Sequence, residues 1–440
     1  MASVDELRAR IEALSSTIYH HRQILMNLES QRSAVRSDLN SILDPMARLP
    51  LEITSDIFLQ CLPTSPQLYP SQAPAIFLRI CRAWNNIALS TPSLWAAISD
   101  GDAALPGDAA LPVAGFNNLF EIWLNRAQSS PISLTLHGSL DGRRYRRNPA
   151  VETLFKRYAH QVRVLTMHLP PRPDLQRITV PFIALKSLTI QATDDSPGLS
   201  HRSTFSPEAA GCVEILRAAP NLVDCTFFGL EYRSVEAVVS PTLTHLSLQN
   251  LLLGEFRRRD PYSYRFVSSA EILRYITLPS LQSLTISNFD FDHTAADFLA
   301  FLTRSSPPLR SLTLRLPGQL LGEVIESYLR LVPGLTHLDI GETWEFRASP
   351  LLKTLGTGHR QVDLLPNLRH LTIRGRLCKP SEYQHVLTVL TLRRATLQSF
   401  RLVDDYPTEV QAAEDIDVAL RQLAEDGMHI YIGKEDQNFG

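Results

Sequence analysis

The chain has 440 residues, enough for two or three domains of about 150 residues each. Its 43 Lys and Arg residues are nearly balanced by 45 Asp and Glu residues, and the net charge of -2 provides no general attraction to nucleic acid or to an anionic membrane. Leucine is the most abundant residue, with 68 copies, and its spacing carries much of the pattern described below.

A heptad pattern occupies the first 42 residues. Apolar side chains recur there at alternating steps of three and four, which is the a/d seam of a coiled coil, and only His21 and Arg32 interrupt it. Neither Gly nor Pro occurs before Pro45, so the pattern predicts one helix over residues 4–42, about 58 Å long at 1.5 Å per residue. A second copy of the chain or the chain's own helices would bury the seam; partial disorder of the segment is a further alternative.

Residues 43–95 have the pattern of a small helical module. Pro50 fixes the first turn of a helix on which Ile53 and Ile57 share one face. After a proline-rich connector, the same helical spacing runs from Ile76 to Ala88. The following aromatic residue, Trp95, is expected to pack back on these helices because its large ring is costly to leave in water.

The order of these residues resembles an F-box: Leu49-Pro50-x-Glu52-Ile53, Ile57-Phe58, Ile80-Cys81-Arg82-x-Trp84 and Pro92-x-Leu94-Trp95. In that family the Leu-Pro turn and the apolar helix faces bind the Skp-type adaptor of cullin-RING ubiquitin ligases. The resemblance implies adaptor binding by seven residues: Leu49, Pro50, Ile53, Ile57, Ile80, Cys81 and Trp84. The chain departs from the pattern in the proline-rich connector and at Ile80, where Val is common. The alternative is that these residues only form the core of the module, which is the favoured interpretation of Trp84, Trp95 and Phe77 taken singly.

A linker at residues 98–130 contains Gly-Asp-Ala-Ala-Leu-Pro twice in tandem and is expected to be an exposed loop followed by a helix. Beyond it the phrase x-Leu-x-x-Leu-x-Leu/Ile recurs at spacings of 21 to 38 residues, scattered around the range of about 20–29 that leucine-rich repeats show. Its nine first positions are Val162, Leu185, Leu222, Leu243, Leu281, Leu309, Leu335, Leu368 and Leu397.

Helical patterns lie between these phrases, so each unit is a helix followed by a short strand. Such a unit cannot bury its apolar face alone, and the units are therefore expected to stack. The whole chain is expected to be α/β: a long helix (1–42), a small all-α F-box-like module (43–97), the linker (98–130) and an irregular leucine-rich-repeat-like solenoid with a parallel concave sheet (131–440). Ile132, Leu134 and Leu136 would supply its first strand, and residues 416–432 a closing cap.

Side chains alternate along a strand, so the residues between the leucines are expected to face the concave surface. In the C-terminal repeats Arg315, Asp339, Arg374 and Arg401 replace Ser and Thr there. Arginine pairs bidentately with carboxylate or phosphate, and these four residues are predicted to bind an acidic or phosphorylated segment of a target protein. The alternatives are a merely solvated strand surface and recognition by the loop arginines 257–259. His245, His337 and His370 occupy the same position of their repeats, but intervening repeats have Ser at that position. No metal shared by these histidines is therefore expected.

The motifs that mark phosphate-binding loops, zinc proteases and serine hydrolases do not occur, nor does a Cys/His pair at the spacing of a catalytic dyad. Five cysteines form no CxxC pair and follow no secretory signal, and no uncharged apolar stretch reaches the roughly 20 residues of a spanning helix. We therefore expect a cytoplasmic or nuclear protein with no catalytic residue, metal, cofactor, nucleic acid or membrane partner. It would be the substrate-recognition subunit of a Skp-cullin-F-box ubiquitin ligase; the alternative is a repeat scaffold that is not attached to a ligase.

Overall fold

The computed structural model describes residues 4–99, 113–137, 155–169, 180–192, 209–229, 243–254, 269–287, 291–316, 322–341, 346–356, 364–404 and 413–434. The described residues up to 132 form one compact unit, and those from 133 onward form a second. The tandem hexapeptide of residues 101–112 and the arginines at 257–259 lie outside the described residues.

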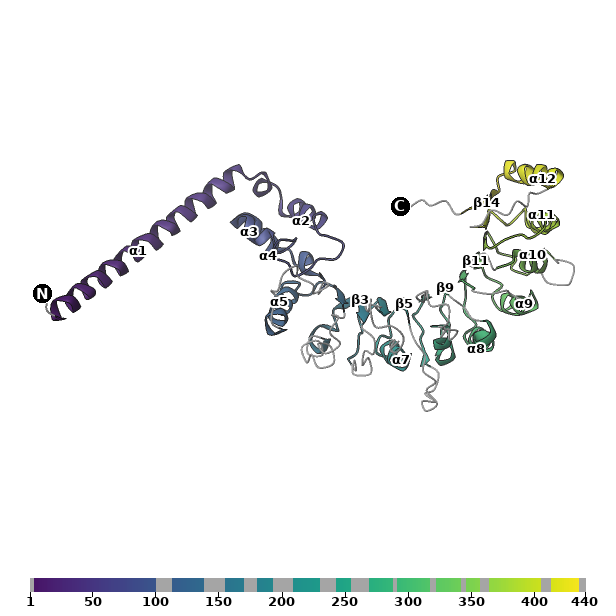
Figure 1. Ribbon diagram of the computed structural model, residues 1–440, viewed down its shortest axis with the longest axis horizontal. Coiled ribbons are helices and arrows are strands. Elements are labelled where there is room, and N and C mark those ends of the chain that lie inside the picture. Colours follow the sequence, from purple (N-terminus) through teal and green to yellow (C-terminus); the bar gives the residue numbers. More distant parts are fainter. Residues whose placement is uncertain are drawn as a thin grey trace. The chain divides into compact units, whose positions relative to one another are not determined.

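The first unit begins with a single long helix, α1 (Val4–Leu43), which Figure 1 shows at the N-terminal end of the chain. The predicted long N-terminal helix is confirmed, and its 40 residues make it about 60 Å long. Its described seam side chains are in contact with water: Leu7, Ile18 and Val35 expose 51%, 53% and 67% of their surface. Within the described residues, the chain's own helices therefore do not bury the seam.

The small module that follows consists of η1 (Pro45–Arg48), α2 (Leu51–Gln60), α3 (Phe77–Ile80), α4 (Arg82–Ser90) and η2 (Pro92–Trp95). The helical spacing from Ile76 to Ala88 is interrupted at Cys81, whose φ of -155° and ψ of 172° are extended. The prediction of one continuous helical pattern is wrong at this residue. The side-chain amide of Asn85 donates to the Leu78 carbonyl at 3.0 Å, so the end of α3 keeps a hydrogen-bond partner across the break.

Trp95 lies in the core of the first unit and has no exposed surface. Its indole Nε1 donates to the Ala88 carbonyl at 2.8 Å. The Trp123 ring, on helix α5 (Val113–Arg126), meets the Trp95 ring edge-on with centroids 5.0 Å apart, and the Arg126 guanidinium lies 4.6 Å from the centroid of the Trp95 ring. The prediction that Trp95 packs back on the helices is confirmed. Strand β1 (Ala97–Ser99) begins two residues after it.

A large sheet runs through the second unit, and its strands from β3 onward are parallel and follow one another in chain order. The predicted α/β class with a large parallel sheet is thereby confirmed. The strands are β2 (Ile132–His137), β3 (Val162–Leu169), β4 (Ser187–Ala192), β5 (Asp224–Phe228), β7 (Asn250–Gly254), β9 (Ser283–Ile286), β10 (Ser311–Leu314), β11 (His337–Gly341), β12 (His370–Arg374), β13 (Ser399–Val403) and β14 (His429–Gly433).

The leucine phrases set the register of this sheet. Leu284 pairs with Leu312, Leu312 with Leu338, and Leu338 with Leu371, so equivalent positions of successive phrases form a continuous row. Each of these four side chains is at most 1% exposed. The residues between them are half-exposed, which gives the strands one buried and one polar face.

Helices follow most of the strands, and Figure 1 shows those from α7 to α12 along one side of the strands. They are α7 (Ala209–Ala218), η5 (Ser269–Tyr275), α8 (Phe291–Ser305), α9 (Gly322–Arg330), α10 (Ala348–Gly356), η6 (Pro380–Glu382), α11 (Tyr383–Leu392) and α12 (Glu414–Glu425). Phe298, Phe301 and Leu329 on these helices are buried, since each amphipathic helix covers the leucine rows with its apolar face. We call the opposite surface of the sheet the polar face.

The prediction that residues 243–249 form a strand of the large sheet is wrong. The phrase occurs there twice in overlapping phases, at 243, 246 and 248 and again at 248, 251 and 253, and the sheet uses the second as β7. Leu246 is 69% exposed, whereas Leu251 and Leu253 are buried. His245 is consequently not on the polar face: it is 3% exposed and its Nε2 donates to the Ala219 carbonyl at 2.7 Å. The short strand β6 (Leu243–Thr244) pairs instead with β8 (Ile276–Thr277).

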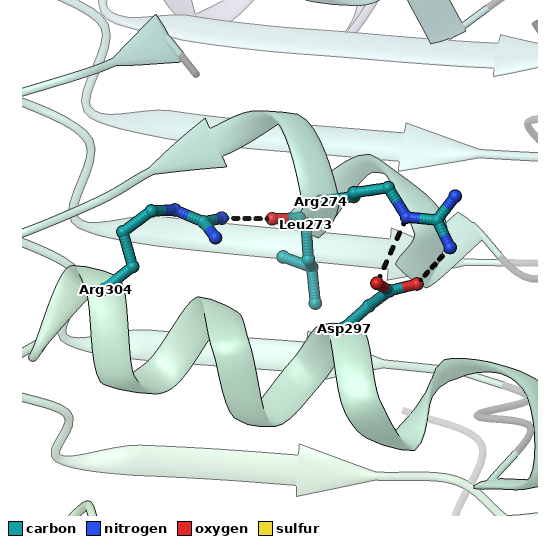
Figure 2. A network of polar contacts seen from close by, with 4 residues as sticks. All are labelled: Leu273, Arg274, Asp297 and Arg304. Atoms are coloured by element: carbon teal, nitrogen blue, oxygen red, sulfur yellow. Dashed lines mark hydrogen bonds and ion pairs between the residues drawn. The ribbon is translucent and has the colours of Figure 1, made fainter. Parts of the chain in front are cut away.

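Arginines at helix ends connect successive helix–strand repeats of the second unit through hydrogen bonds. Arg304, near the end of α8, donates to the carbonyls of Leu273 and Ile276 at 2.8 and 2.7 Å and to the Thr277 hydroxyl at 3.0 Å. Figure 2 shows the Arg304 guanidinium beside the Leu273 carbonyl. It also shows the neighbouring Arg274, which donates from two nitrogens to the Asp297 carboxylate on α8. The Arg304 guanidinium thus provides donors to two carbonyls at the end of the η5 turn, which gives the network a structural role.

Arg393 makes a similar arrangement three repeats further along the chain. It follows α11 directly and donates to the carbonyls of Leu364 and Leu365, the second at 2.8 Å. Leu365 has a φ of +56°, a left-handed conformation that is uncommon for a residue with a branched side chain. Arg393 is 7% exposed. Its two hydrogen bonds link the turn at Leu364 and Leu365 to the end of α11.

Candidate functional site

Three aromatic rings form the centre of the module at residues 45–95. The rings of Phe58 and Phe77 stack with centroids 4.3 Å apart, and Trp84 contacts both, at 4.9 and 5.8 Å. Phe58 and Phe77 are 1% and 5% exposed. The interpretation of Trp84 and Phe77 as core residues therefore fits the contacts they make.

Asp44 connects the start of the module to its last helix. Its Oδ1 accepts the Met46 backbone N–H at 2.9 Å and caps η1, while its Oδ2 accepts the indole N–H of Trp84 at 2.6 Å and the Cys81 thiol at 3.6 Å. Asp44 was not predicted from the sequence. Asp followed by Pro45 at the beginning of a helical turn is the signal that would have indicated a cap.

We expect Asp44→Ala to destabilise the module by about 2 kcal/mol, because it removes a helix cap and leaves a half-buried indole N–H without its charged acceptor. Asp44→Asn retains an acceptor oxygen and should cost about half as much. Hydrogen exchange of the amides at 45–95 measures the effect, with the exposed Asp56→Ala as the control. Equal exchange in the two alanine variants would show that Asp44 does not hold the module together.

The apolar residues assigned to adaptor binding lie on the surface. Leu49, Ile53, Ile57 and Ile80 expose 41%, 48%, 38% and 50% of their area, and Pro50 is exposed as well. The two remaining assigned residues, Cys81 and Trp84, are half-buried and bonded to Asp44. The structure thus separates the predicted set into five exposed residues and two half-buried residues.

Two further apolar side chains of this module were missed from the sequence. Leu51 at the start of α2 and Ile76 just before α3 expose 46% and 36% of their area. Single exposed aliphatic side chains are ordinary on soluble proteins, whereas residues 49–80 expose six large ones. We call Leu49, Leu51, Ile53, Ile57, Ile76 and Ile80 the apolar set.

On the polar face, Asp339 lies between two arginines. Arg315 donates from Nη1 and Nη2 to the two oxygens of Asp339, each at 2.7 Å, and the Nε of Arg374 is 3.5 Å from Oδ1. They come together because β10, β11 and β12 are adjacent and in register. Two guanidinium groups and one carboxylate leave a formal charge of +1, so the chain itself neutralises part of the predicted positive charge. All three side chains are 22–25% exposed.

The fourth predicted residue, Arg401, lies one strand further along. Its guanidinium is 5.2 Å from the centroid of the Tyr431 ring on β14, a cation–π arrangement that orients a side chain otherwise in contact with water. Tyr431 was missed because residues 416–432 were assigned only to a cap. The pairing of Arg401 with Tyr431 in the strand register is what places the ring there.

Two of the predicted histidines also meet on the polar face. The rings of His337 and His370 stack with centroids 4.3 Å apart. Burial lowers the pKa of His337, and the neighbouring His370 and Arg369 lower it further. The described residues include no cluster of three or more His, Cys, Asp and Glu side chains that could hold a metal ion.

Cys212 and Cys225 are the buried thiols of the described residues. Burial raises the pKa of Cys212 to about 12 and that of Cys225 well above its ordinary value, so both stay protonated and are poor nucleophiles.

Among the described helices none is both long and apolar enough to cross a membrane. A scan against models of known protein families and a search of curated proteins found no match to this chain.

Proposed function

We propose that this chain is the substrate-recognition subunit of a Skp-cullin-F-box type ubiquitin ligase. Residues 43–97 act as the F-box and bind a Skp-type adaptor, and through it the cullin-RING ligase. The leucine-rich-repeat-like solenoid of residues 131–440 binds a target protein. Partner proteins in the cytosol or nucleus carry out ubiquitin transfer, and this chain contributes no catalytic residue and no cofactor.

One observation carries the proposal: the four aliphatic residues of the F-box pattern that are assigned to adaptor binding, Leu49, Ile53, Ile57 and Ile80, are exposed, although the module has an aromatic core of its own. The rings of Phe58, Phe77 and Trp84 pack against one another. The exposure of Ile53 and Ile57 therefore does not result from the lack of a core in the module. Apolar side chains held outward on short helices gain free energy when a partner covers them. The resemblance identifies the adaptor as that partner.

The polar face supports the second half of the proposal. Its C-terminal part presents Arg374, Arg401 and Tyr431 from strands fixed by the sheet, so little ordering is needed when a target binds. Arginine and tyrosine are the residue types enriched where binding energy concentrates.

Direct binding to an adaptor tests the proposed function. The purified full-length chain is mixed with a purified Skp-type adaptor, and complex formation is followed by co-elution and calorimetry. A stable one-to-one complex of chain and adaptor supports the ligase assignment. Absence of binding by a folded chain would overturn it in favour of a repeat scaffold that is not attached to a ligase.

For target recognition, we expect Arg374→Ala combined with Arg401→Ala to reduce capture of the chain's specific targets by about two to four orders of magnitude, because each charge-assisted contact contributes about 1.5–3 kcal/mol. Adaptor binding should be unchanged. Quantitative mass spectrometry of captured proteins compares the variant with Arg217→Ala combined with Arg421→Ala, two exposed helical arginines. Capture that persists here but disappears when residues 257–259 are neutralised would place recognition in that segment instead.

A further inference from the structure

Helix α1 presents an apolar seam that none of the described residues covers. The a positions are Val4, Ile11, Ile18, Leu25, Arg32 and Leu39, and the d positions are Leu7, Leu14, His21, Leu28, Val35 and Ile42. Of the apolar members whose side chains are described, every one exposes more than half of its area, from 51% to 67%. The adaptor and target sites proposed above make no use of this helix.

We propose that α1 pairs with α1 of a second copy of this chain to form a parallel, in-register, two-stranded coiled coil. The first argument is the distribution of side-chain shapes. In the first three heptads the a positions are Val4, Ile11 and Ile18, all β-branched, and the first two d positions are leucine. β-Branched residues at a with leucine at d favour parallel dimers over trimers and tetramers.

The second argument comes from the two seam residues that are not apolar. In a parallel, in-register pair, His21 faces His21 and Arg32 faces Arg32, and the other ten layers are entirely apolar. In the antiparallel pair with full overlap, His21 faces Leu25 and Arg32 faces Leu14, each twice, so four layers combine a polar with an apolar side chain. Keeping polar residues together in two layers is the device by which coiled coils select orientation and register. The long Arg32 side chain can extend its guanidinium to water beside the seam.

The third argument is the area that pairing would bury. Covering a half-exposed aliphatic side chain removes roughly 60–90 Å² from water. For the nine described apolar seam residues on each of two helices the total is about 1,100–1,600 Å², which is in the range of specific protein interfaces.

Sedimentation equilibrium of the full-length chain tests the pairing. We expect twice the 49.4 kDa chain mass at tens of micromolar, and a single chain mass for Leu14→Glu combined with Leu28→Glu, both at d positions. The matched control is Tyr19→Glu combined with Met26→Glu, which replaces equally exposed side chains on another face of α1 and should remain dimeric. A monomeric parent chain, or a d-position variant that remains dimeric, would overturn the proposal.

Orientation is tested by Leu7→Cys in the full-length chain. Parallel pairing places the two introduced thiols in one layer, and mild oxidation should join them, as mass spectrometry of the linked peptides would show. In the antiparallel pair they are about 48 Å apart and cannot react. The unsubstituted chain, oxidised alongside, identifies any link through the exposed Cys61. A dimer in which the introduced thiols do not join would exclude parallel pairing. Adaptor binding, measured separately on the same samples, reports on the F-box module and not on α1.

Discussion

Ile53→Asp and Ile57→Asp are each expected to abolish adaptor binding while leaving the chain folded. In the free protein these side chains are 48% and 38% exposed, so a carboxylate at either position stays hydrated. In the complex the same carboxylate would be buried against an apolar surface without a partner. That costs about 3 kcal/mol or more, which lowers affinity by at least roughly two orders of magnitude.

Calorimetry with the purified adaptor measures this loss, and circular dichroism establishes that each variant is folded. Leu89→Asp is the matched control, since Leu89 is an equally exposed aliphatic residue on α4 that the F-box pattern does not include. Unchanged affinity in folded Ile53→Asp and Ile57→Asp variants would remove α2 from the adaptor site. A loss that is equally large in Leu89→Asp would show a general effect of added charge.

Arg393→Met should destabilise the second unit by about 3 kcal/mol. Methionine fills a similar length of space, but it removes both guanidinium hydrogen bonds: the half-buried Leu364 carbonyl loses its Arg393 donor, and the buried Leu365 carbonyl keeps only the Leu368 N–H at 3.2 Å. The next residue offers a matched control: Arg394 carries the same charge, is 61% exposed and pairs with Asp426 at 2.8 Å. Arg394→Met should cost at most about 1 kcal/mol, because exposed ion pairs contribute little.

Urea unfolding and hydrogen exchange of the amides at 364–404 distinguish the two variants. We expect faster exchange in Arg393→Met, concentrated at the turn that holds Leu365 and at the end of α11. The structural role assigned to Arg393 is wrong if both variants unfold at the same urea concentration.

Local patterns in the sequence were sufficient for much of this fold. The absence of Gly and Pro before Pro45 predicts α1, and the leucine phrases predict the strands because a buried strand face needs an apolar residue at every second position. The prediction fails where two phrases overlap. Leu248 belongs to both, and only the packing of Leu251 and Leu253 against neighbouring strands decides which phase is used.

The candidate sites were less predictable, because side-chain pairing depends on which residues the fold brings together. Arg315 and Asp339 are 24 positions apart, and their bidentate contact exists only because β10 and β11 are neighbours. Asp44 and Trp84 are likewise joined by the packing of the module and not by any short-range pattern. The exposure of Ile53 and Ile57, in contrast, fits what the F-box resemblance implied about them.

The in-register strands also constrain the spacing of any peptide that lies across the polar face. Neighbouring strands are about 4.8 Å apart, while an extended peptide advances about 3.3 Å per residue, so two strands correspond to three peptide residues. Arg315 directly follows β10 and Arg374 ends β12, and these strands are two apart in the sheet. If the polar face binds a target peptide as proposed, a peptide lying in this direction would reach Arg315 and Arg374 with acidic groups three residues apart.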